Sequence, residues 1–551
     1  MTKVFNAAAC LLATAILSGC VGTKSSHPVP VEFENLQIKS ELATRLHKNF
    51  DRLEEDMYRP DSIFNSQLAQ SWPGDAQGRV VLGLVLDARA TGRAPLYLDQ
   101  IVSAYPSKMN ELGYFGPILD GVINEQQLSG NGWVLRGLCE YYEWKKDPKT
   151  LEMITNIVDN LFMKGKGMYS QYPIDPEGRR KNLGDAIGEI VYNEDQWILS
   201  SDIGCIFIGM EGLIHAYKIL GREDMKEVIE ELIDRFLEVD LVGIRAQTHA
   251  SLTACRGLIR YAEITGRTEL IDEAAKRWDL YLRYGMTENY ENYNWFERYN
   301  TWSEPCAVVD SYMVAMQLWM HTGNPEYIDQ AELIYYNGLC HSQRYNGGFG
   351  CDFGPGNARH THDLSVRTDE AHWCCTMRGA EGLARAAAYS YYSAGNAVYV
   401  PFYHTGEVNI PVAGGALKMS QSTEYPFGDS VVFNIKSAPK KAISLRIKLP
   451  VHTEAHKLSI NGEEVPFVQE GGFAVVERKF KGGDSITWSF KMQELTVNTA
   501  VNPDNTDSEL RHFHGVLLLG KENGSDTLEP IYHLMDSKVW KSEDYTNQIL
   551  F

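Results

Sequence analysis

Hydrophobic positions recur at helical spacing from about residue 80 to residue 395, in segments that each end at a short turn. The turns hold Gly or Asp and are followed by a fresh apolar-periodic segment, as at 90–93, 146–148, 220–222, 265–267, 322–325 and 393–395. Their irregular spacing is not that of a solenoid with a fixed repeat. The roughly six helical hairpins predict an (α/α)6 toroid, a closed double ring of helices, with long loops gathered at one mouth.

After Asn396 the hydrophobic pattern changes to alternation. Apolar side chains stand at every second position in 431–435, 443–449 and 486–490, and turn signals separate these runs at 427–429, 461–462 and 482–484. Alternation between closely spaced turns is typical of an antiparallel β-sandwich. We therefore predict a helical catalytic domain over 39–395 and a β-sandwich domain over 396–551.

The N-terminus predicts export. Lys3 precedes an apolar stretch, and Leu17-Ser18-Gly19-Cys20 resembles the end of a bacterial lipoprotein signal, in which Cys20 is the acylated residue. An ordinary secretory signal is the alternative. Residues 21–38 carry Ser, Thr and two prolines, and are predicted to tether the fold to the lipid. Val21, which is not aspartate, favours the outer membrane over the inner membrane, on either face.

Composition narrows the partners. The 551-residue chain has a formal net charge of −20 and no run of basic residues, which excludes a nucleic-acid partner. After the N-terminus no apolar stretch is long enough to cross a bilayer. The chain holds 29 Tyr and 11 Trp, whose flat rings either stack on sugars or fill cores. Neither the net charge nor the aromatic content identifies a substrate, and the sequence does not predict the oligomeric state.

The cysteines are unevenly placed. Three of the ten lie in apolar helical segments and are predicted to be packed core thiols, namely Cys139, Cys205 and Cys255. Cys340 and Cys351 either pair with each other or remain free.

Cys374 and Cys375 are adjacent, so a disulfide between them would require a strained ring, and a shared metal explains them better. Glu304 and Cys306, two positions apart, are predicted to lie on one side of an extended segment. Together the four residues supply the thiolate and carboxylate donors of a tetrahedral zinc ion. A pair of core cysteines or a redox pair are the alternatives.

These segments also carry a family resemblance. Ser303-Glu304-Pro305-Cys306-Ala307, His372-Trp373-Cys374-Cys375 and Arg378 resemble the signature of glycoside hydrolase family 127, the β-L-arabinofuranosidases. The resemblance extends from about residue 70 to the end of the chain and includes 247–249, 336–338 and 458–462. It implies Zn2+ bound by Glu304, Cys306, Cys374 and Cys375, with Cys374 as the nucleophile.

The resemblance also implies a glutamate that acts as general acid and base. Glu288, sixteen positions before Glu304, matches this position best, and Glu291 and Glu297 are the alternatives. Neighbouring aromatic residues, Tyr290, Tyr293, Trp295 and Phe296, predict a walled pocket in which burial would raise the pKa of the acid.

Several residues are candidates for sugar contacts. His249 either hydrogen-bonds a sugar hydroxyl or has a core or capping role, and Trp295 is predicted to contact the substrate. His372 contacts the substrate, supports the metal site or is an exposed loop histidine. Trp72 and Trp133 form either a sugar platform or part of the core.

The chain also departs from the family. The histidine that the arabinofuranosidases carry before Gly212 is replaced by the apolar segment 206–208, and the segment 347–357 is unlike the usual sugar-contacting strand. The predicted function is a zinc-dependent retaining glycosidase that removes a terminal sugar, such as β-L-arabinofuranose, from plant-type glycans. The alternatives are a polysaccharide lyase and a non-catalytic, glycan-binding surface lipoprotein.

Overall fold

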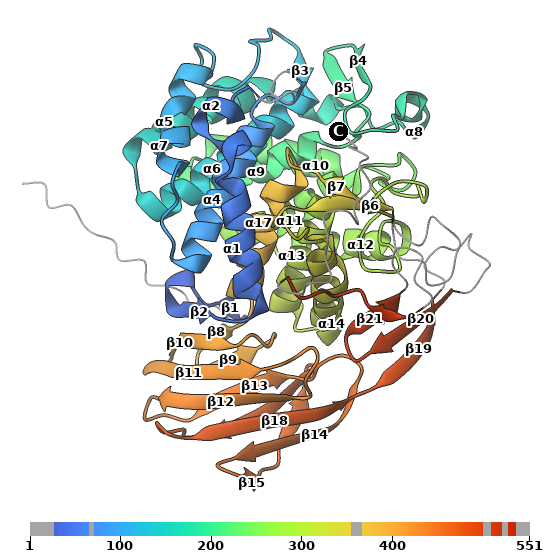
Figure 1. Cartoon of the computed structure of the whole chain (residues 1–551). Coiled ribbons are helices and arrows are strands. Elements are labelled where there is room, and N and C mark those ends of the chain that lie inside the picture. The colour runs from blue at the N-terminus through green and yellow to red at the C-terminus, as the bar shows by residue number, and fades with distance from the viewer. Residues whose placement is uncertain (1–26, 66–70, 354–365, 500–508, 521–526, 536–551) are drawn as a thin grey trace, which may run out of the picture.

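The computed structural model describes residues 27–65, 71–353, 366–499, 509–520 and 527–535, and the predicted signal and Cys20 lie outside these ranges. A helical domain stands on a β-sandwich, and the last strands of the chain run back along the side of the helices (Figure 1). Among the described helices, none is both long enough and apolar enough to cross a membrane.

Within the described residues, six helices form a closed ring in which each contacts the next and the last contacts the first. In ring order these are α4 (Asp75–Thr91), α6 (Glu125–Lys145), α9 (Ile206–Leu220), α11 (Thr248–Thr265), α13 (Pro305–Thr322) and α17 (Cys375–Ala388). All six are buried on nearly every side because other helices surround them. The predicted toroid is confirmed.

A second layer of helices covers the ring. Each outer helix packs on an inner neighbour: α5 (Leu98–Lys108), α7 (Pro148–Ile157), α10 (Asp224–Leu237), α12 (Glu269–Tyr284), α14 (Pro325–Ile334) and α1 (Glu41–Leu53). The N-terminal α1 packs on α4 and α17, so the first helix of the chain completes the outer layer beside the last. Four of the predicted turns are left-handed glycine caps, Gly92, Gly221, Gly266 and Gly323.

Two sheets form the sandwich. One has the order β1 (Val29–Pro30), β8 (Tyr392–Ala394), β9 (Ala397–Val400), β13 (Ile443–Lys448), β17 (Phe473–Arg478), β16 (Val468–Glu470). The other has the order β15 (Glu463–Glu464), β14 (Thr453–Ile460), β18 (Ser485–Met492), β12 (Ser430–Ser437), β11 (Gly415–Thr423), β10 (Gly406–Val412), β2 (Leu36–Ile38). Pairing is antiparallel except between β9 and β13. The alternating positions are buried as predicted, with Val431 opposite Trp488 and Phe433 opposite Ile486.

Two sequence predictions are corrected here. The segment predicted as a tether contributes β1 to the first sheet and β2 to the second, because its apolar residues find edge strands to pair with. Gly395, predicted to end a helix, turns the β8–β9 hairpin instead, so the helical domain ends at Ala388.

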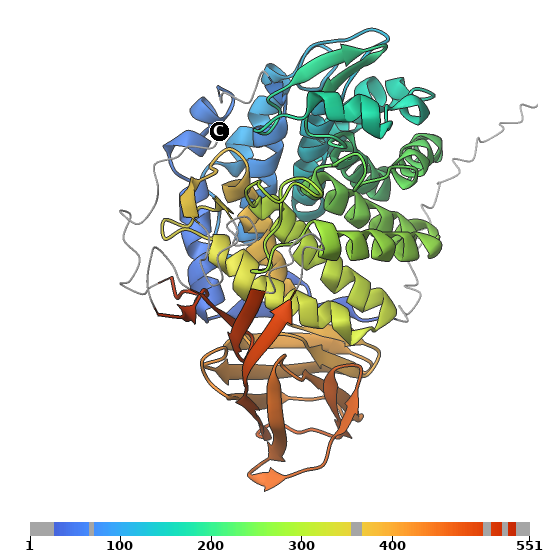
Figure 2. The same ribbon diagram turned by 90° about the vertical axis from the view of Figure 1, so that its right-hand side faces the viewer.

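The C-terminal strands form a third sheet, β19 (Glu494–Thr499), β20 (Glu509–His514), β21 (Leu517–Gly520) and β22 (Glu529–Pro530), beside the helical domain (Figure 2). Hydrogen bonds join it to the loop that follows α12 and to the π-helical turn (Tyr335–Leu339) that follows α14. Arg511 donates to the carbonyl oxygen of Glu288 over 2.8 Å, and Asn337 donates to that of Val516 over 3.0 Å. This sheet therefore braces the segment that carries the predicted acid/base.

Candidate active site and metal centre

Two inner helices begin at the cysteine cluster. Pro305 occupies the first turn of α13, with Glu304 as the N-cap and Cys306 one residue further along the helix. Cys374 is the N-cap of α17, and Cys375 is its first residue. The prediction of an extended Glu304–Cys306 segment was wrong, because Pro305 starts the helix there. Both helix dipoles direct their positive ends at the thiols, which favours thiolates.

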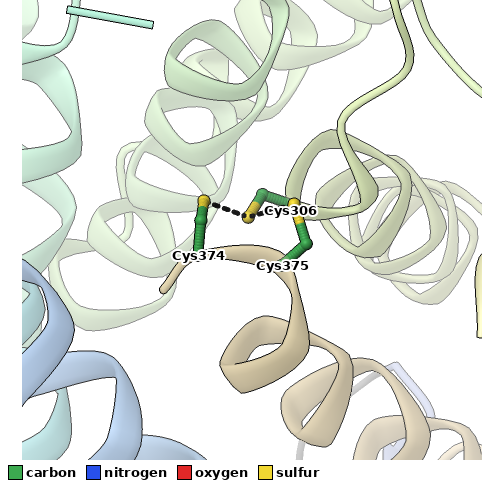
Figure 3. A group of neighbouring side chains, drawn as sticks. All are labelled: Cys306, Cys374 and Cys375. Atoms are coloured by element: carbon green, nitrogen blue, oxygen red, sulfur yellow. Dashed lines mark hydrogen bonds between the residues drawn. The ribbon is translucent and has the colours of Figure 1, made fainter. Parts of the chain in front are cut away.

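The side chains of this cluster approach one another closely. The Cys306 sulfur lies between those of Cys374 and Cys375, at 3.3 and 3.9 Å (Figure 3). The Cys374 sulfur lies 3.6 Å from Oε1 of Glu304. Ligands of a tetrahedral zinc ion stand about 3.8 Å apart for two sulfurs and about 3.5 Å apart for sulfur and oxygen. The four predicted ligands are therefore brought together at separations close to those that zinc requires.

The three thiols differ in exposure and acidity. Cys374 is partly exposed, whereas Cys306 and Cys375 are fully buried. The thiols of Cys306 and Cys375 hydrogen-bond the Cys374 sulfur and hold its pKa well below the usual value. Burial raises the pKa of Cys306 and of Cys375. Cys374 is thus both the accessible thiol and the one whose thiolate is best stabilised.

The chemistry of this donor set fits a divalent cation. Burial and the nearby Cys374 thiolate raise the pKa of Glu304 well above its usual value. Without a metal, the buried thiols and the Glu304 carboxyl must therefore carry protons. A bound divalent cation would displace these protons. Arg79 supplies one positive charge, donating to the Cys306 sulfur over 3.3 Å while Asp75 holds its guanidinium.

His249 is placed beside these donors. Its ring lies within reach of Glu304 and Cys306, so that all three could share one ion. Nδ1 lies 2.9 Å from Oδ2 of Asp310, which leaves Nε2 without a hydrogen bond to any described residue. Burial, with the charges of Arg79 and Arg378, lowers the pKa of His249 to about 4, so the ring is neutral. A neutral Nε2 can accept a hydrogen bond from a sugar or bind a metal.

Asp310 is the centre of a buried ion network inside the ring. Its Oδ1 accepts hydrogen bonds from Arg256 and Arg378 over 2.7 and 2.6 Å, and Oδ2 accepts one from Thr253. Burial would raise the pKa of this carboxyl, but Arg378 and Arg256 hold it well below the usual value. Asp310 therefore remains ionised and fixes the orientation of His249.

The three candidate acid/base glutamates lie in different surroundings. Glu291 is fully buried, and its two oxygens accept hydrogen bonds from Ser342 and Asn289 over 3.2 and 3.0 Å. Burial and the neighbouring Asp352 raise the pKa of Glu291. Glu288 is 4% exposed and lies in the same loop, and Glu297 is half-buried. The roles of these residues stay predictions.

The predicted sugar contacts are also placed. Trp295 is fully buried, with the Arg298 guanidinium 4.2 Å from its ring centre. His372 is half-buried beside Trp373, two residues before Cys374. Trp133 is buried in the ring, where Arg79 lies 4.0 Å from its ring centre, and Trp72 is 7% exposed. Trp133 therefore belongs to the core.

The remaining described cysteines form no disulfide bonds. Cys340 and Cys351, which the sequence left either paired or free, are not joined. Cys351 instead lies 3.9 Å from the Cys375 sulfur, at the edge of the cluster. Cys139, Cys205 and Cys255 are buried, as predicted.

Sequence reasoning missed two contacts of the donors: Arg79 donates to the Cys306 sulfur, and the Gln247 side-chain amide donates to Glu304 over 3.4 Å. It also missed Asp75, which accepts hydrogen bonds from Arg79. The i,i+4 spacing of Asp75 and Arg79 was a usable signal for their ion pair. Nothing in the sequence connects that pair to Cys306, 227 positions away.

Comparisons with known proteins agree with the resemblance. Residues 239–388 match the model of the GH127 β-L-arabinofuranosidase catalytic domain, and residues 397–492 match that of the GH127 middle domain. The chain carries a glycoside hydrolase catalytic domain. This match favours hydrolysis over the lyase and non-catalytic alternatives. A search of curated proteins finds no match.

Solved structures share the fold. A GH127 β-arabinofuranosidase superposes with a TM-score of 0.67 at 15% identity, over 90% of this chain and 85% of its own. The GH127 β-L-arabinofuranosidase Ara127N of Geobacillus stearothermophilus T6 superposes with a TM-score of 0.62 at 15% identity, over 88% of this chain and 86% of its own. A further glycoside hydrolase superposes with a TM-score of 0.66 at 14% identity, over 90% of this chain and 84% of its own.

Replacing Asp310 with Asn should destabilise the protein strongly. The change removes the charge of one of the two carboxylates that neutralise both buried arginines, Arg256 and Arg378, and leaves only Glu381, which costs about 3 to 5 kcal/mol of unfolding free energy. Because the folded-state pKa of Asp310 lies below the unfolded value of about 3.9, this stabilisation is present at neutral pH and is lost as the pH falls below that value.

Thermal unfolding at pH 7 measures the loss. The control is Glu407→Gln, which breaks an exposed ion pair with Lys39 and Lys436 and should leave the midpoint nearly unchanged. Equal midpoints for Asp310→Asn and the wild type would contradict the role given to Asp310.

Proposed function

We propose that this protein is a zinc-dependent retaining glycosidase that removes a terminal sugar, such as β-L-arabinofuranose, from plant-type oligosaccharides. The observation that carries the proposal is the partly exposed Cys374 thiol, which has a lowered pKa and lies within 3.6 Å of the Glu304 carboxylate at the start of α17. Glu304, Cys306, Cys374 and Cys375 would hold the metal. When bound, zinc supplies the positive charge that keeps these thiols ionised at neutral pH.

Two displacements at the anomeric carbon account for the reaction. In the first, the Cys374 sulfur forms a bond to that carbon while the bond to the glycosidic oxygen breaks, and Glu288 gives its proton to the departing oxygen. In the second, the Glu288 carboxylate takes a proton from water. The resulting hydroxide bonds to the anomeric carbon, and the thiolate leaves. Two inversions retain the configuration.

Cys374→Ser should abolish turnover, because a serine hydroxyl is neither ionised at neutral pH nor a good leaving group. Elemental analysis should find about one zinc per wild-type chain. Hydrolysis of a panel of p-nitrophenyl furanosides and pyranosides should fall by at least about 10³-fold in the variant.

The matched control is Cys255→Ser, which changes a buried thiol in α11 and should retain both zinc and activity. The mechanism would be contradicted if the wild type contained no zinc or if the Cys374→Ser variant kept its activity.

Glu288→Gln should lower turnover by about 10²–10⁴-fold, with the smallest loss for substrates whose leaving group departs without a proton. Azide needs no general base, so it should restore turnover of such a substrate and give a glycosyl azide of retained configuration. Product analysis by NMR checks this outcome.

Glu291→Gln is the comparison variant, because Glu291 is an alternative candidate for the acid/base. Its carboxylate accepts hydrogen bonds from Asn289 and Ser342. If azide rescues Glu291→Gln and not Glu288→Gln, the acid/base assignment moves to Glu291.

We also propose that the chain is exported and anchored through Cys20 to the outer membrane, on the basis of its first twenty residues. In the native host, the full-length protein should take up labelled fatty acid and sediment with membranes. Cys20→Ala should be unlabelled and should appear in the soluble fraction. An unlabelled, soluble wild type would exclude the lipid anchor and leave an ordinary secretory signal.

A further inference from the structure

A buried arginine beside the cysteine cluster has no part in the two displacements proposed above. Arg79 lies near the start of α4 and is 4% exposed. Its Nη1 donates to the Cys306 sulfur over 3.3 Å. An arginine side chain is always charged and is costly to bury, so its place against a sulfur requires an explanation.

Two contacts fix the orientation of the Arg79 guanidinium. Asp75 accepts hydrogen bonds from Nε and Nη2 over 2.6 and 3.1 Å, in a bidentate ion pair. The Trp133 indole packs on the guanidinium, whose carbon lies 4.0 Å from the ring centre. Because the ion pair uses Nε and Nη2, Nη1 is the nitrogen left to face Cys306.

The backbone of α4 is fixed as closely, because α4 and α6 pack against each other through glycines. A Cβ at Gly78 would come within 2.2 Å of the carbonyl carbon of Trp133, and one at Gly137 would come within 2.6 Å of the Gly78 carbonyl oxygen. Only glycine allows the two helices to approach this closely. Since Gly78 directly precedes Arg79, this packing holds the arginine against Trp133 and Cys306.

The contact with Arg79 distinguishes Cys306 from the other two thiols of the cluster. Among the residues that the structure describes, no nitrogen donates to the sulfur of Cys374 or of Cys375. Cys306 is also fully buried, whereas Cys374 is partly exposed. A charge-assisted hydrogen bond stabilises the lone pairs of a thiolate and makes them less reactive. The sulfur that Arg79 holds is therefore suited to bind a metal, and the exposed sulfur without such a donor is suited to attack a substrate.

Residues that hydrogen-bond a metal ligand orient that ligand and tune its binding to the metal. Arg79 has this relation to Cys306, and Asp75 has the next one outward, since it orients Arg79. The ion pair of Asp75 and Arg79 adds no net charge to the site. Its effect on a metal therefore comes from the hydrogen bond and from the position of the Cys306 sulfur.

We propose that Arg79 is a positioning residue of the metal site, which through its hydrogen bond holds Cys306 as a metal ligand and leaves Cys374 as the nucleophile. Asp75 orients the guanidinium for this task. The inference rests on the metal site of the proposed function and does not depend on which sugar is removed.

The test measures the dissociation constant for zinc of the reduced protein, in competition with a chromophoric chelator. The variant is Asp75→Asn/Arg79→Met, in which an uncharged pair replaces the ion pair. This change leaves the net charge of the site the same and leaves no buried charge without a partner. The variant should bind zinc about 10- to 100-fold more weakly than the wild type.

A spectroscopic measurement separates the lost hydrogen bond from a general loss of stability. With Co2+ in place of zinc, the wild type should show charge-transfer bands from thiolate to metal. Loss of the Arg79 donor raises the energy of the Cys306 lone pairs, so a band of the double variant should move to longer wavelength. A merely structural role for Arg79 would not move it.

The matched control is Arg385→Met, which removes another arginine ion pair, that with Glu140, near the end of α17. It should keep the zinc affinity and the Co2+ bands of the wild type. If the double variant does not fold, Arg79→Lys decides. A lysine keeps the charge beside Asp75 but lacks the planar fork that reaches two partners at once, so zinc affinity should fall about 10-fold.

The outcomes separate this inference from the proposed function. If the wild type binds zinc, and the folded variant either binds it as tightly or leaves the Co2+ bands unshifted, the role of Arg79 is overturned and the metal site stands. If the affinity falls and the band shifts as expected but the wild type hydrolyses no glycoside, the role of Arg79 stands and the proposed reaction fails. A wild type that binds neither zinc nor Co2+ would overturn both.

Discussion

The rest of the site depends on the close approach of three thiols and a carboxylate at the beginnings of two neighbouring helices. α13 and α17 are adjacent in the inner ring, and both start at the same mouth, so Glu304 and Cys306 meet Cys374 and Cys375. Four acidic groups within a few ångströms repel one another when ionised. Helix dipoles and the Arg79 guanidinium stabilise their ionised state, and a divalent cation bound there would stabilise it further.

The interior of the ring buries positive charges, whereas the cysteine cluster gathers acidic groups. Arg136, Arg256 and Arg378 are buried there, and Asp310 and Glu381 neutralise them through hydrogen bonds of 2.6–2.9 Å. Such a network is costly to desolvate, yet it fixes the side chains that point toward the mouth. His249 is the clearest case, since Asp310 holds one ring nitrogen and the other remains available beside Glu304.

Segments far apart in the chain supply the walls of the site. The loop before α13 carries Glu288 and Trp295, the loop before α9 carries Asp202, and the C-terminal sheet holds the first of these loops through Arg511. A change in these loops would alter the walls of the site without altering the thiols. The resemblance to glycoside hydrolase family 127 follows a similar division, because it includes the four predicted ligands and is lost in 206–208 and 347–357.

Sequence periodicity determined the architecture, because helix and strand spacing are local properties that burial on one face imposes residue by residue. The Glu304-X-Cys306 and Cys374-Cys375 motifs also predicted four residues that the structure brings together, and their role as metal ligands stays a prediction. The prediction for Cys340 and Cys351 remained open, because the spacing of two cysteines does not show which sulfur each one meets, and Cys351 meets that of Cys375. The segment 21–38 was misjudged, because the strands that it pairs with lie hundreds of positions away.

Only the tertiary structure placed Arg79 against Cys306, Asp310 against His249 and Asp202 beside Trp295. Each of these contacts joins residues on different elements, and its energy comes from desolvation and charge in a shared interior. A sequence lists the groups that could interact. Which buried polar groups pair with one another is decided when the ring closes and excludes water.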